Sequence, residues 1–256
     1  METAFHDRIP VLLYHSVSDE PAPEIADFAI GPDAFAEQIK LVAESRRTAV
    51  TLSELARRLE SGDTDNLVCV TFDDGWRDNI AAAETLAAAG VPATIYVTSD
   101  YVGRPNMVDA GELAALAQAP GIEIGAHSVN HQHLDELPSA EAGAEIGDSK
   151  HAIEQLIGAP VTTFAYPHGA YDRRVRESVI EHGFKSAAAV KNALSHGDDD
   201  RYAIARWTIT AGSTSSEVAE LLAGRGAPLA WQSERIRTKG YRAVRRLRRR
   251  VAGRDG

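Results

Sequence analysis

The 256-residue sequence contains a single cysteine, Cys69, and lacks any long run of apolar residues. An intramolecular disulfide is therefore impossible, which is typical of proteins from a reducing compartment. A membrane-spanning helix needs about 18 or more consecutive apolar residues, so none is expected. The N-terminus shows neither the basic start nor the apolar stretch of a secretory signal. Together these absences predict a cytoplasmic protein, with Cys69 as a small buried hydrophobe.

The net charge of −10 is unevenly distributed along the chain. Residues 234–256 carry nine Arg and one Lys against Glu234 and Asp255, a net charge of +8, which leaves −18 for residues 1–233. Four apolar residues of this tail approximate one helical stripe: Ile236, Val244, Leu247 and Val251. A basic amphipathic helix favours contact with an anionic membrane surface, here the inner membrane face. An unstructured tail and a nucleic-acid contact are the alternatives, and the acidic body disfavours nucleic acid.

Apolar segments typical of strands alternate with helical patterns along residues 1–233. The predicted strands are residues 9–14, 67–72, 93–97, 122–126, 161–165, 185–190 and 202–209. The predicted helices are residues 33–44, 53–60, 77–89, 111–118, 139–157, 172–182 and 215–223. Strand–helix repeats with short connections favour an α/β fold with a parallel sheet covered by helices, and their number favours a closed barrel in a single domain. Residues 195–200 are predicted to form a solvated loop.

The first motif whose side chains could take part in catalysis or metal binding is Thr71-Phe72-Asp73-Asp74-Gly75, at the end of a predicted strand. In a parallel α/β barrel, the loops after the strands build the active site. Adjacent carboxylates point in different directions, so one can bind a metal ion while its neighbour faces the substrate. The alternative is that an Asp caps the next helix, which accounts for one carboxylate but not for two.

The second motif, His127-Ser128-Val129-Asn130-His131, follows the predicted strand 122–126. Histidines four residues apart share one face of a helical turn, as in metal-binding helices. One carboxylate and two imidazoles form a facial ligand set that leaves positions open for water. A lone histidine here would more often be structural, but two at this spacing favour a metal site. His133 is offset by six residues and is expected to point elsewhere.

These two motifs, their spacing and the segment 91–97 resemble the polysaccharide deacetylase family (carbohydrate esterase family 4, NodB homology domain). The likeness runs from about Ile9 to Ile209, and it implies a distorted (β/α)7-type barrel over residues 1–233. It also implies that one divalent metal ion, often zinc, is bound by a set of three residues: Asp74, His127 and His131. Cobalt, nickel and manganese are alternatives, because the same ligands serve several ions. Asp73 would be the general base that accepts a proton from water.

The third motif, Phe164-Ala165-Tyr166-Pro167-His168-Gly169, resembles the family's Arg-x-Pro-Tyr-Gly segment with two departures. Ala165 takes the place of the arginine that orients the base, and Arg206 is the candidate to replace it. His168 takes the place of the tyrosine whose backbone N–H helps to form an oxyanion site, a role that does not depend on the side chain. We expect His168 and Tyr166 near the substrate, with a simple Pro-His-Gly turn as the alternative.

A departing amine must be protonated, so a general acid is required. Family members that resemble this chain at the N-terminus use a histidine in a Tyr-His pair after the first strand, which here is Tyr14-His15. Other members place the acid in a Leu-x-His segment near the C-terminus, and no such segment is expected here, because the only histidine after His182 is His196, in a predicted polar loop. His15 is therefore the expected acid, with a structural histidine as the alternative. Trp76 is expected at the rim of the site, where an aromatic ring can stack on a sugar.

The sequence thus predicts a metal-dependent hydrolase that removes an N-acetyl group from an amino sugar. The sugar would belong to a polysaccharide, an oligosaccharide or a lipid- or nucleotide-linked precursor. The alternative is a related amidohydrolase, such as a formamido-sugar deformylase or a cyclic imide or ureide hydrolase, and the released product distinguishes these activities. A binding protein without catalysis is a third reading, but it predicts the loss of a base or a ligand, and all four residues are present.

Overall fold

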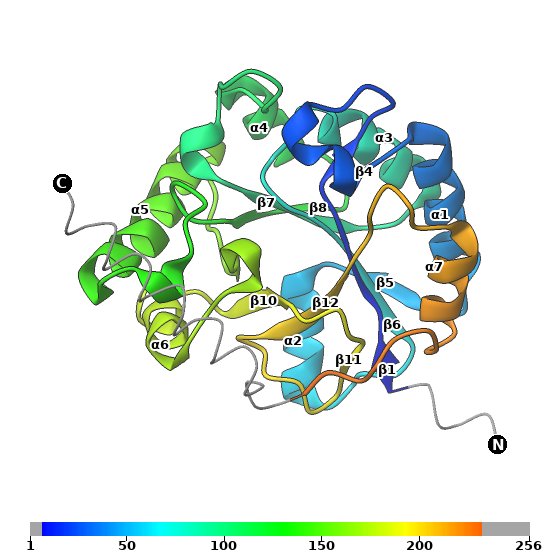
Figure 1. Ribbon diagram of the computed structural model, residues 1–256. Coiled ribbons are helices and arrows are strands. Elements are labelled where there is room, and N and C mark those ends of the chain that lie inside the picture. The colour runs from blue at the N-terminus through cyan, green and yellow to red at the C-terminus, as the bar shows by residue number, and fades with distance from the viewer. Residues whose placement is uncertain (1–6, 232–256) are drawn as a thin grey trace.

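In the computed structural model, which describes residues 7–231, a barrel of strands is surrounded by helices (Figure 1). The strands are β1 (Arg8–Ile9), β2 (Val11–Tyr14), β3 (Ser16–Val17), β4 (Ala29–Ile30), β5 (Thr48–Val50), β6 (Leu67–Phe72), β7 (Ala93–Val97), β8 (Ile122–Ala126), β9 (Thr163–Ala165), β10 (Ser186–Val190), β11 (Ser195–His196) and β12 (Ile204–Thr208). The α-helices are α1 (Pro32–Glu44), α2 (Leu52–Ser61), α3 (Asn79–Ala89), α4 (Ala110–Leu116), α5 (Ser139–Ile157), α6 (Arg173–Glu181) and α7 (Ser215–Leu222). Short 3-10 helices are η2 (Pro23–Phe28), η3 (Ser99–Tyr101), η4 (Leu134–Glu136) and η5 (Pro167–Gly169).

The barrel closes through parallel strands in the order β2-β12-β10-β9-β8-β7-β6, with β6 pairing back to β2. The short strand β5 adds to the sheet alongside the first half of β6. The predicted (β/α)7-type barrel in one domain is thereby confirmed. The strand β5 was not predicted, because its three residues are too few to show a periodic pattern. The basic tail predicted at residues 234–256 lies outside the described residues.

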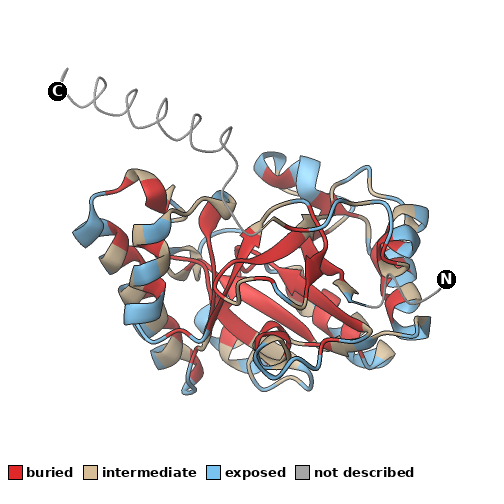
Figure 2. Cartoon of the chain, turned by 90° about the horizontal axis from the view of Figure 1, so that it is seen from below, coloured by how far each residue is buried: buried red, intermediate tan, exposed pale blue. Residues whose placement is uncertain are grey.

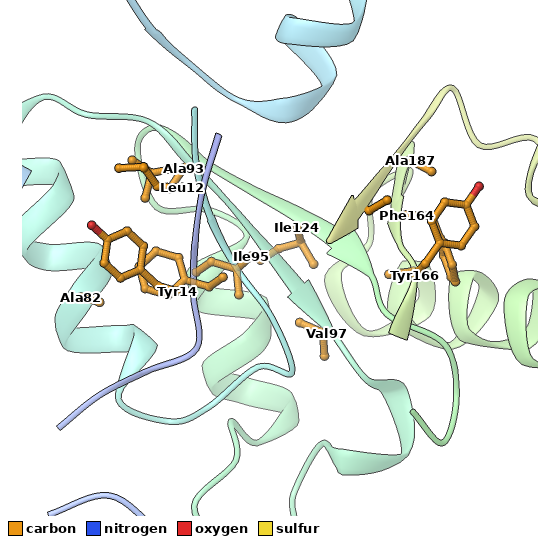
Figure 3. Close-up of a cluster of buried hydrophobic side chains, with 14 of the residues drawn as sticks. Leu12, Tyr14, Ala82, Ala93, Ile95, Val97, Ile124, Phe164, Tyr166 and Ala187 are labelled. Carbon is orange, nitrogen blue, oxygen red and sulfur yellow. The ribbon is translucent and has the colours of Figure 1, made fainter. Parts of the chain in front are cut away.

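The main core lies between the barrel and its surrounding helices. Figure 3 shows part of it, including Leu12 of β2 and Ile95 of β7, both almost completely buried. Figure 2 shows the buried strands in red at the centre and the exposed outer faces of the helices in pale blue. All six residues of β6 are buried. A strand that is covered on both faces has a nearly continuous apolar sequence, as β6 does.

The amino-terminal end of the barrel is closed by helix α2. Leu52 and Leu55 of this helix join a core cluster with residues from several strands, among them Cys69, which is buried as predicted. Glu123 of β8 fixes the start of α2, because its Oε2 accepts hydrogen bonds from the Ser53 backbone N–H (3.2 Å) and from the Thr94 hydroxyl (2.7 Å). The carboxyl ends of the strands are left to form the functional site.

The segment 195–200 was predicted to be a solvated loop, but Ser195, His196 and Asp199 are buried, so this prediction is wrong. Ser195 and His196 form β11, which pairs with β1. The carboxylate of Asp199 lies 2.9 Å from Lys191 Nζ and also accepts a hydrogen bond from Ser195 Oγ. A buried ion pair therefore organises this acidic segment. Within residues 7–231, no helix is long and apolar enough to cross a membrane.

Candidate active site

A cleft of about 1290 Å³ opens at the carboxyl ends of the barrel strands. Its lining includes five residues expected to carry the chemistry: His15, Asp73, Asp74, His127 and His131. They come from three loops, which follow β2, β6 and β8. The barrel therefore brings together side chains that are far apart in the sequence, as expected for the carboxyl end of such a fold.

Asp73 is held by the guanidinium of Arg206, which projects from β12. Arg206 donates from Nη1 to Asp73 Oδ1 (2.6 Å) and from Nη2 to Oδ2 (2.8 Å), and both side chains are buried. The guanidinium lies over the ring of Tyr96, 5.4 Å from its centroid. Burial alone would raise the pKa of Asp73, but the charge of Arg206 and the hydrogen bonds that it donates hold that pKa below its usual range. Asp73 is thus an ionised carboxylate with a fixed orientation.

Asp74 turns away from its neighbour because its backbone is in the left-handed region, with φ at 74°. Its Oδ1 lies 3.4 Å from His131 Nε2 and 3.7 Å from His127 Nε2. Its Oδ2 accepts a hydrogen bond from the indole N–H of Trp76 (3.2 Å). Burial raises the pKa of Asp74 to about 6, opposite in direction to the shift of Asp73. Neither Asp caps α3, whose N-cap residue is Asp78.

His127 and His131 present neutral nitrogens to this carboxylate. The Nδ1 of His127 lies 2.8 Å from the carbonyl oxygen of Ala165. Because a carbonyl only accepts, Nδ1 carries the proton and Nε2 keeps its lone pair. Burial lowers the pKa of His127 to about 3, and it lowers the pKa of His131 as well. Both imidazoles are therefore in the form that binds a metal ion.

The segment from His127 to His131 is a loop, so the predicted helical turn is wrong. Ser128 and His131 have positive φ values of 64° and 55°. The Ser128 hydroxyl accepts from the His131 N–H (3.0 Å), and Glu145 of α5 accepts from the N–H groups of Val129 (3.0 Å) and Asn130 (2.8 Å). These side-chain acceptors replace the hydrogen bonds of a helix. Glu145 was missed, although a buried glutamate on the apolar face of a predicted helix is a usable signal.

The three residues fit a divalent metal ion. The ligand atoms of Asp74, His127 and His131 all lie within 4.8 Å of one another. Asp74 Oδ1 is buried and accepts no hydrogen bond from the described residues. A buried carboxylate oxygen without a donor is costly unless a cation neutralises it. One carboxylate with two imidazoles is also a ligand set that suits zinc and related ions.

His15 lies in the same cleft, beyond the end of β2. Asn79 of α3 donates to its carbonyl oxygen (2.7 Å), and its ring centroid is 5.3 Å from that of Phe28. Burial lowers the pKa of His15, while the charges of Asp73 and Asp74 raise it. His196, in the segment Leu194-Ser195-His196, does match the Leu-x-His pattern in its letters. It is nevertheless part of β11 at the amino-terminal side and does not line the cleft.

Three further predicted residues lie in different places. His168 lines the cleft, with Nε2 3.2 Å from the His131 carbonyl oxygen and its ring stacked on that of His133 at 3.9 Å. Tyr166 is buried outside the cleft, where its hydroxyl donates to the Tyr202 carbonyl oxygen (2.9 Å), so its predicted contact with substrate is wrong. Trp76 reaches the cleft but is only 7% exposed, because its indole is directed at Asp74 rather than at the rim.

A closed (β/α) barrel with this aspartate and histidine set at its open end is typical of a hydrolase. The sequence model of the polysaccharide deacetylase family matches residues 60–187, half of the chain. The chain therefore belongs to the polysaccharide deacetylase family, whose members hydrolyse the carbon–nitrogen bond of non-peptide amides.

Individual proteins are similar to this chain in sequence or in fold. YxkH, a Bacillus subtilis protein that carries the family's name, is 24% identical over 212 residues, covering 82% of this chain and 74% of YxkH. The deacetylase PplD of Streptococcus pyogenes has a similar structure, with a TM-score of 0.76 and 21% identity over 82% of this chain and 96% of that chain. The polysaccharide deacetylase BC0361 of Bacillus cereus superposes with a TM-score of 0.73 and 24% identity, covering 84% and 69% of the two chains.

Proposed function

We propose that this chain is a metal-dependent N-deacetylase that releases acetate from an N-acetylated amino sugar in a glycan. The observation that carries the proposal is that two neighbouring carboxylates differ in their main partner. Asp73 is ionised and held by Arg206, whereas Asp74 has no guanidinium partner among the described residues and its Oδ1 lies near both His131 and His127. His127 Nε2 lies between the two carboxylates, 3.6 Å from Asp73 Oδ2 and 3.7 Å from Asp74 Oδ1. The arrangement of Asp73 suits a base, and that of Asp74 suits a metal ligand.

The proposed roles follow from what each group can donate or accept. Asp74, His127 and His131 would hold one divalent ion, which supplies polarisation of the amide carbonyl and acidification of water. Asp73 accepts the proton of the attacking water, and Arg206 keeps the carboxylate ionised and oriented while it does so. His15 donates a proton to the departing nitrogen. The products are a free amine and acetate.

The size and lining of the cleft favour a chain of sugars, rather than a small molecule, as the substrate. Its volume of about 1290 Å³ exceeds the roughly 300–1,000 Å³ of ordinary small-molecule pockets. Phe28, Tyr101 and Trp207 line its walls, and aromatic rings of this kind stack on the apolar faces of sugars. We therefore place an oligosaccharide or polysaccharide ahead of a nucleotide-linked precursor as the substrate.

The test is an acyl-release assay on the full chain after chelation and after return of zinc, cobalt, nickel or manganese. Oligomers of N-acetylglucosamine should release acetate only in the metal-loaded protein, and faster than the monosaccharide. Formate from N-formylated sugars, or ring opening of cyclic imides, without acetate release would replace the proposal with the related amidohydrolase activity. Equal rates with and without metal would refute metal dependence.

A further inference from the structure

We propose that Trp76 is a positioning residue that makes Asp74 a one-oxygen metal ligand and thereby sets the affinity of the site for its ion. This inference rests on the ligand set proposed above. It gives Trp76 a role that differs from the sugar-stacking one predicted from the sequence.

The geometry separates the two oxygens of the Asp74 carboxylate. The indole N–H of Trp76 donates to Oδ2 at 3.2 Å, whereas Oδ1 points toward His127 and His131. An indole N–H is a donor with no acceptor capacity, so it cannot itself bind the cation. While Oδ2 is engaged in this way, rotation of the carboxylate toward two-oxygen binding would break the hydrogen bond. Oδ1 is thus the oxygen presented to the ion.

The position of the indole is fixed on several sides. Trp76 forms an isolated antiparallel bridge with Met107, and its ring packs in a cluster with Met107 and Ile25. The flanking residues are tied to the same segment, because Val108 N–H donates to the Gly75 carbonyl oxygen (3.1 Å) and Arg77 N–H to that of Asn106 (2.8 Å). A donor anchored in this manner restricts its acceptor with little further loss of conformational entropy.

The backbone of Asp74 makes such a restraint useful. Its φ of 74° lies in a region that an L-residue with a side chain rarely adopts. The Asp74 carbonyl oxygen accepts from the Thr98 N–H at 3.3 Å, and Gly75 follows with φ at 84°. The main chain therefore directs the carboxylate inward, and the indole selects its rotation.

Trp207 provides a matched control. It also lines the cleft, and its indole N–H also donates to a carboxylate at 3.2 Å, but that carboxylate belongs to Glu217 and not to the proposed ligand set. Removal of the indole N–H at this position should leave metal affinity unchanged. A general effect of losing a tryptophan from the cleft would appear in both variants.

The experiment measures zinc affinity of the full chain by competition with a chromophoric chelator. Trp76→Phe should weaken zinc binding by about 10- to 100-fold, the range for partners of metal ligands, and Trp207→Phe should not. A wild-type dissociation constant in Trp76→Phe would overturn the inference. If Trp76→Phe does not fold, replacement of Trp76 by 3-benzothienylalanine, which has sulfur in place of N–H in the same shape, decides between the same two outcomes.

The result also separates this inference from the proposed function. Asp74→Ala should abolish zinc binding if the ligand set is right. Unchanged zinc affinity in Asp74→Ala, or no binding of zinc, cobalt, nickel or manganese by the wild-type chain, would overturn both proposals. Loss of binding in Asp74→Ala together with full binding in Trp76→Phe would overturn only the role of Trp76.

Discussion

The two ends of the barrel differ in the residues that adopt positive φ values in their turns. Where helices lead into strands, the residues with positive φ values are glycines together with Asn66: the glycines are Gly62, Gly90, Gly121, Gly158 and Gly183. Where strands lead into helices, glycines also adopt positive φ values, at Gly75, Gly103 and Gly169, but six residues with side chains do so as well: Asp74, Asn106, Ser128, His131, His168 and Asn192. A side chain in this region carries strain that glycine avoids. The strained turns therefore gather at the end that holds the candidate site.

Polar groups divide in the same way. At the closed end, Glu123 is bonded to Thr94 and to the start of α2. At the open end, Asp74 Oδ1 and His15 Nδ1 are buried and have no hydrogen bond with the described residues. The polar groups at the closed end thus stabilise the fold, whereas buried polar atoms at the open end are available to bind a ligand or transfer a proton.

Among the changes that test this comparison, Asp73→Asn should have the largest effect, a loss of kcat. The amide keeps the shape of the side chain but cannot accept the proton from water, so kcat should fall by about 10²- to 10⁴-fold. Zinc content should stay near one ion per chain, because Asp73 is not a proposed ligand. Initial rates of acetate release and elemental analysis measure the two effects. Retained turnover would assign the base to another residue.

Arg206→Met tests whether the open end depends on a buried ion pair. The change leaves the Asp73 carboxylate buried without its counter-ion, so the free energy of unfolding should fall by about 3–5 kcal/mol in urea titrations. The pKa of Asp73 should rise, because Arg206 no longer favours its ionised form. The acid limb of the kcat/KM profile should then move to higher pH. A loss of stability with an unmoved acid limb would make Arg206 merely structural.

Glu123→Gln is the matched change at the closed end. It weakens the hydrogen bonds that Glu123 accepts from Thr94 and Ser53, at a cost of about 1–3 kcal/mol in the free energy of unfolding. The kcat should be that of the wild type, because Glu123 does not line the cleft. A clear fall in kcat would show that the two ends are coupled.

The pH dependence of the metal-free protein should show the raised pKa of Asp74, about 6, against about 3.9 in an unfolded chain. The contribution of the protonated Asp74 carboxyl to the free energy of unfolding is fully present below pH ~4, and it is lost as the pH rises through about 6. Relative to Asp74→Asn, the metal-free wild type should therefore lose about 3 kcal/mol between pH 4 and pH 7.5. Urea titrations of both proteins at several pH values give this difference. A flat difference would contradict the burial of an unpaired carboxylate.

The sequence was sufficient for features whose cause is local. The buried strand β6 reads as an apolar run because both of its faces are covered, and Asp73 and Asp74 follow it directly. The paired histidines and His15 are likewise identified by their position after strands. Their surroundings are a different matter. The contact between Arg206 and Asp73 joins residues 133 positions apart, and the sequence could only nominate Arg206 as a candidate.

The backbone of the histidine loop could not be predicted for a related reason. Spacing alone favoured a helical turn, but acceptors on Ser128 and on the distant Glu145 compensate the backbone N–H groups of a non-helical path. The same limit applies to Trp76. Its aromatic ring suggested stacking on a sugar. The packing against Met107, which the sequence does not reveal, directs its indole N–H to Asp74.

Gly158→Ala and Asn106→Gly should give the smallest effects, and together they isolate the cost of a left-handed residue at each end. Gly158 ends α5 with φ at 68°, and an added Cβ would meet no atom of the described residues within 4 Å. The cost is therefore backbone strain alone, about 1 kcal/mol in the free energy of unfolding, with kcat unchanged. At the open end, Asn106→Gly should change stability by less than ~0.5 kcal/mol, since asparagine tolerates this region. If Gly158→Ala were neutral, glycine at the closed end would not reflect the avoidance of strain.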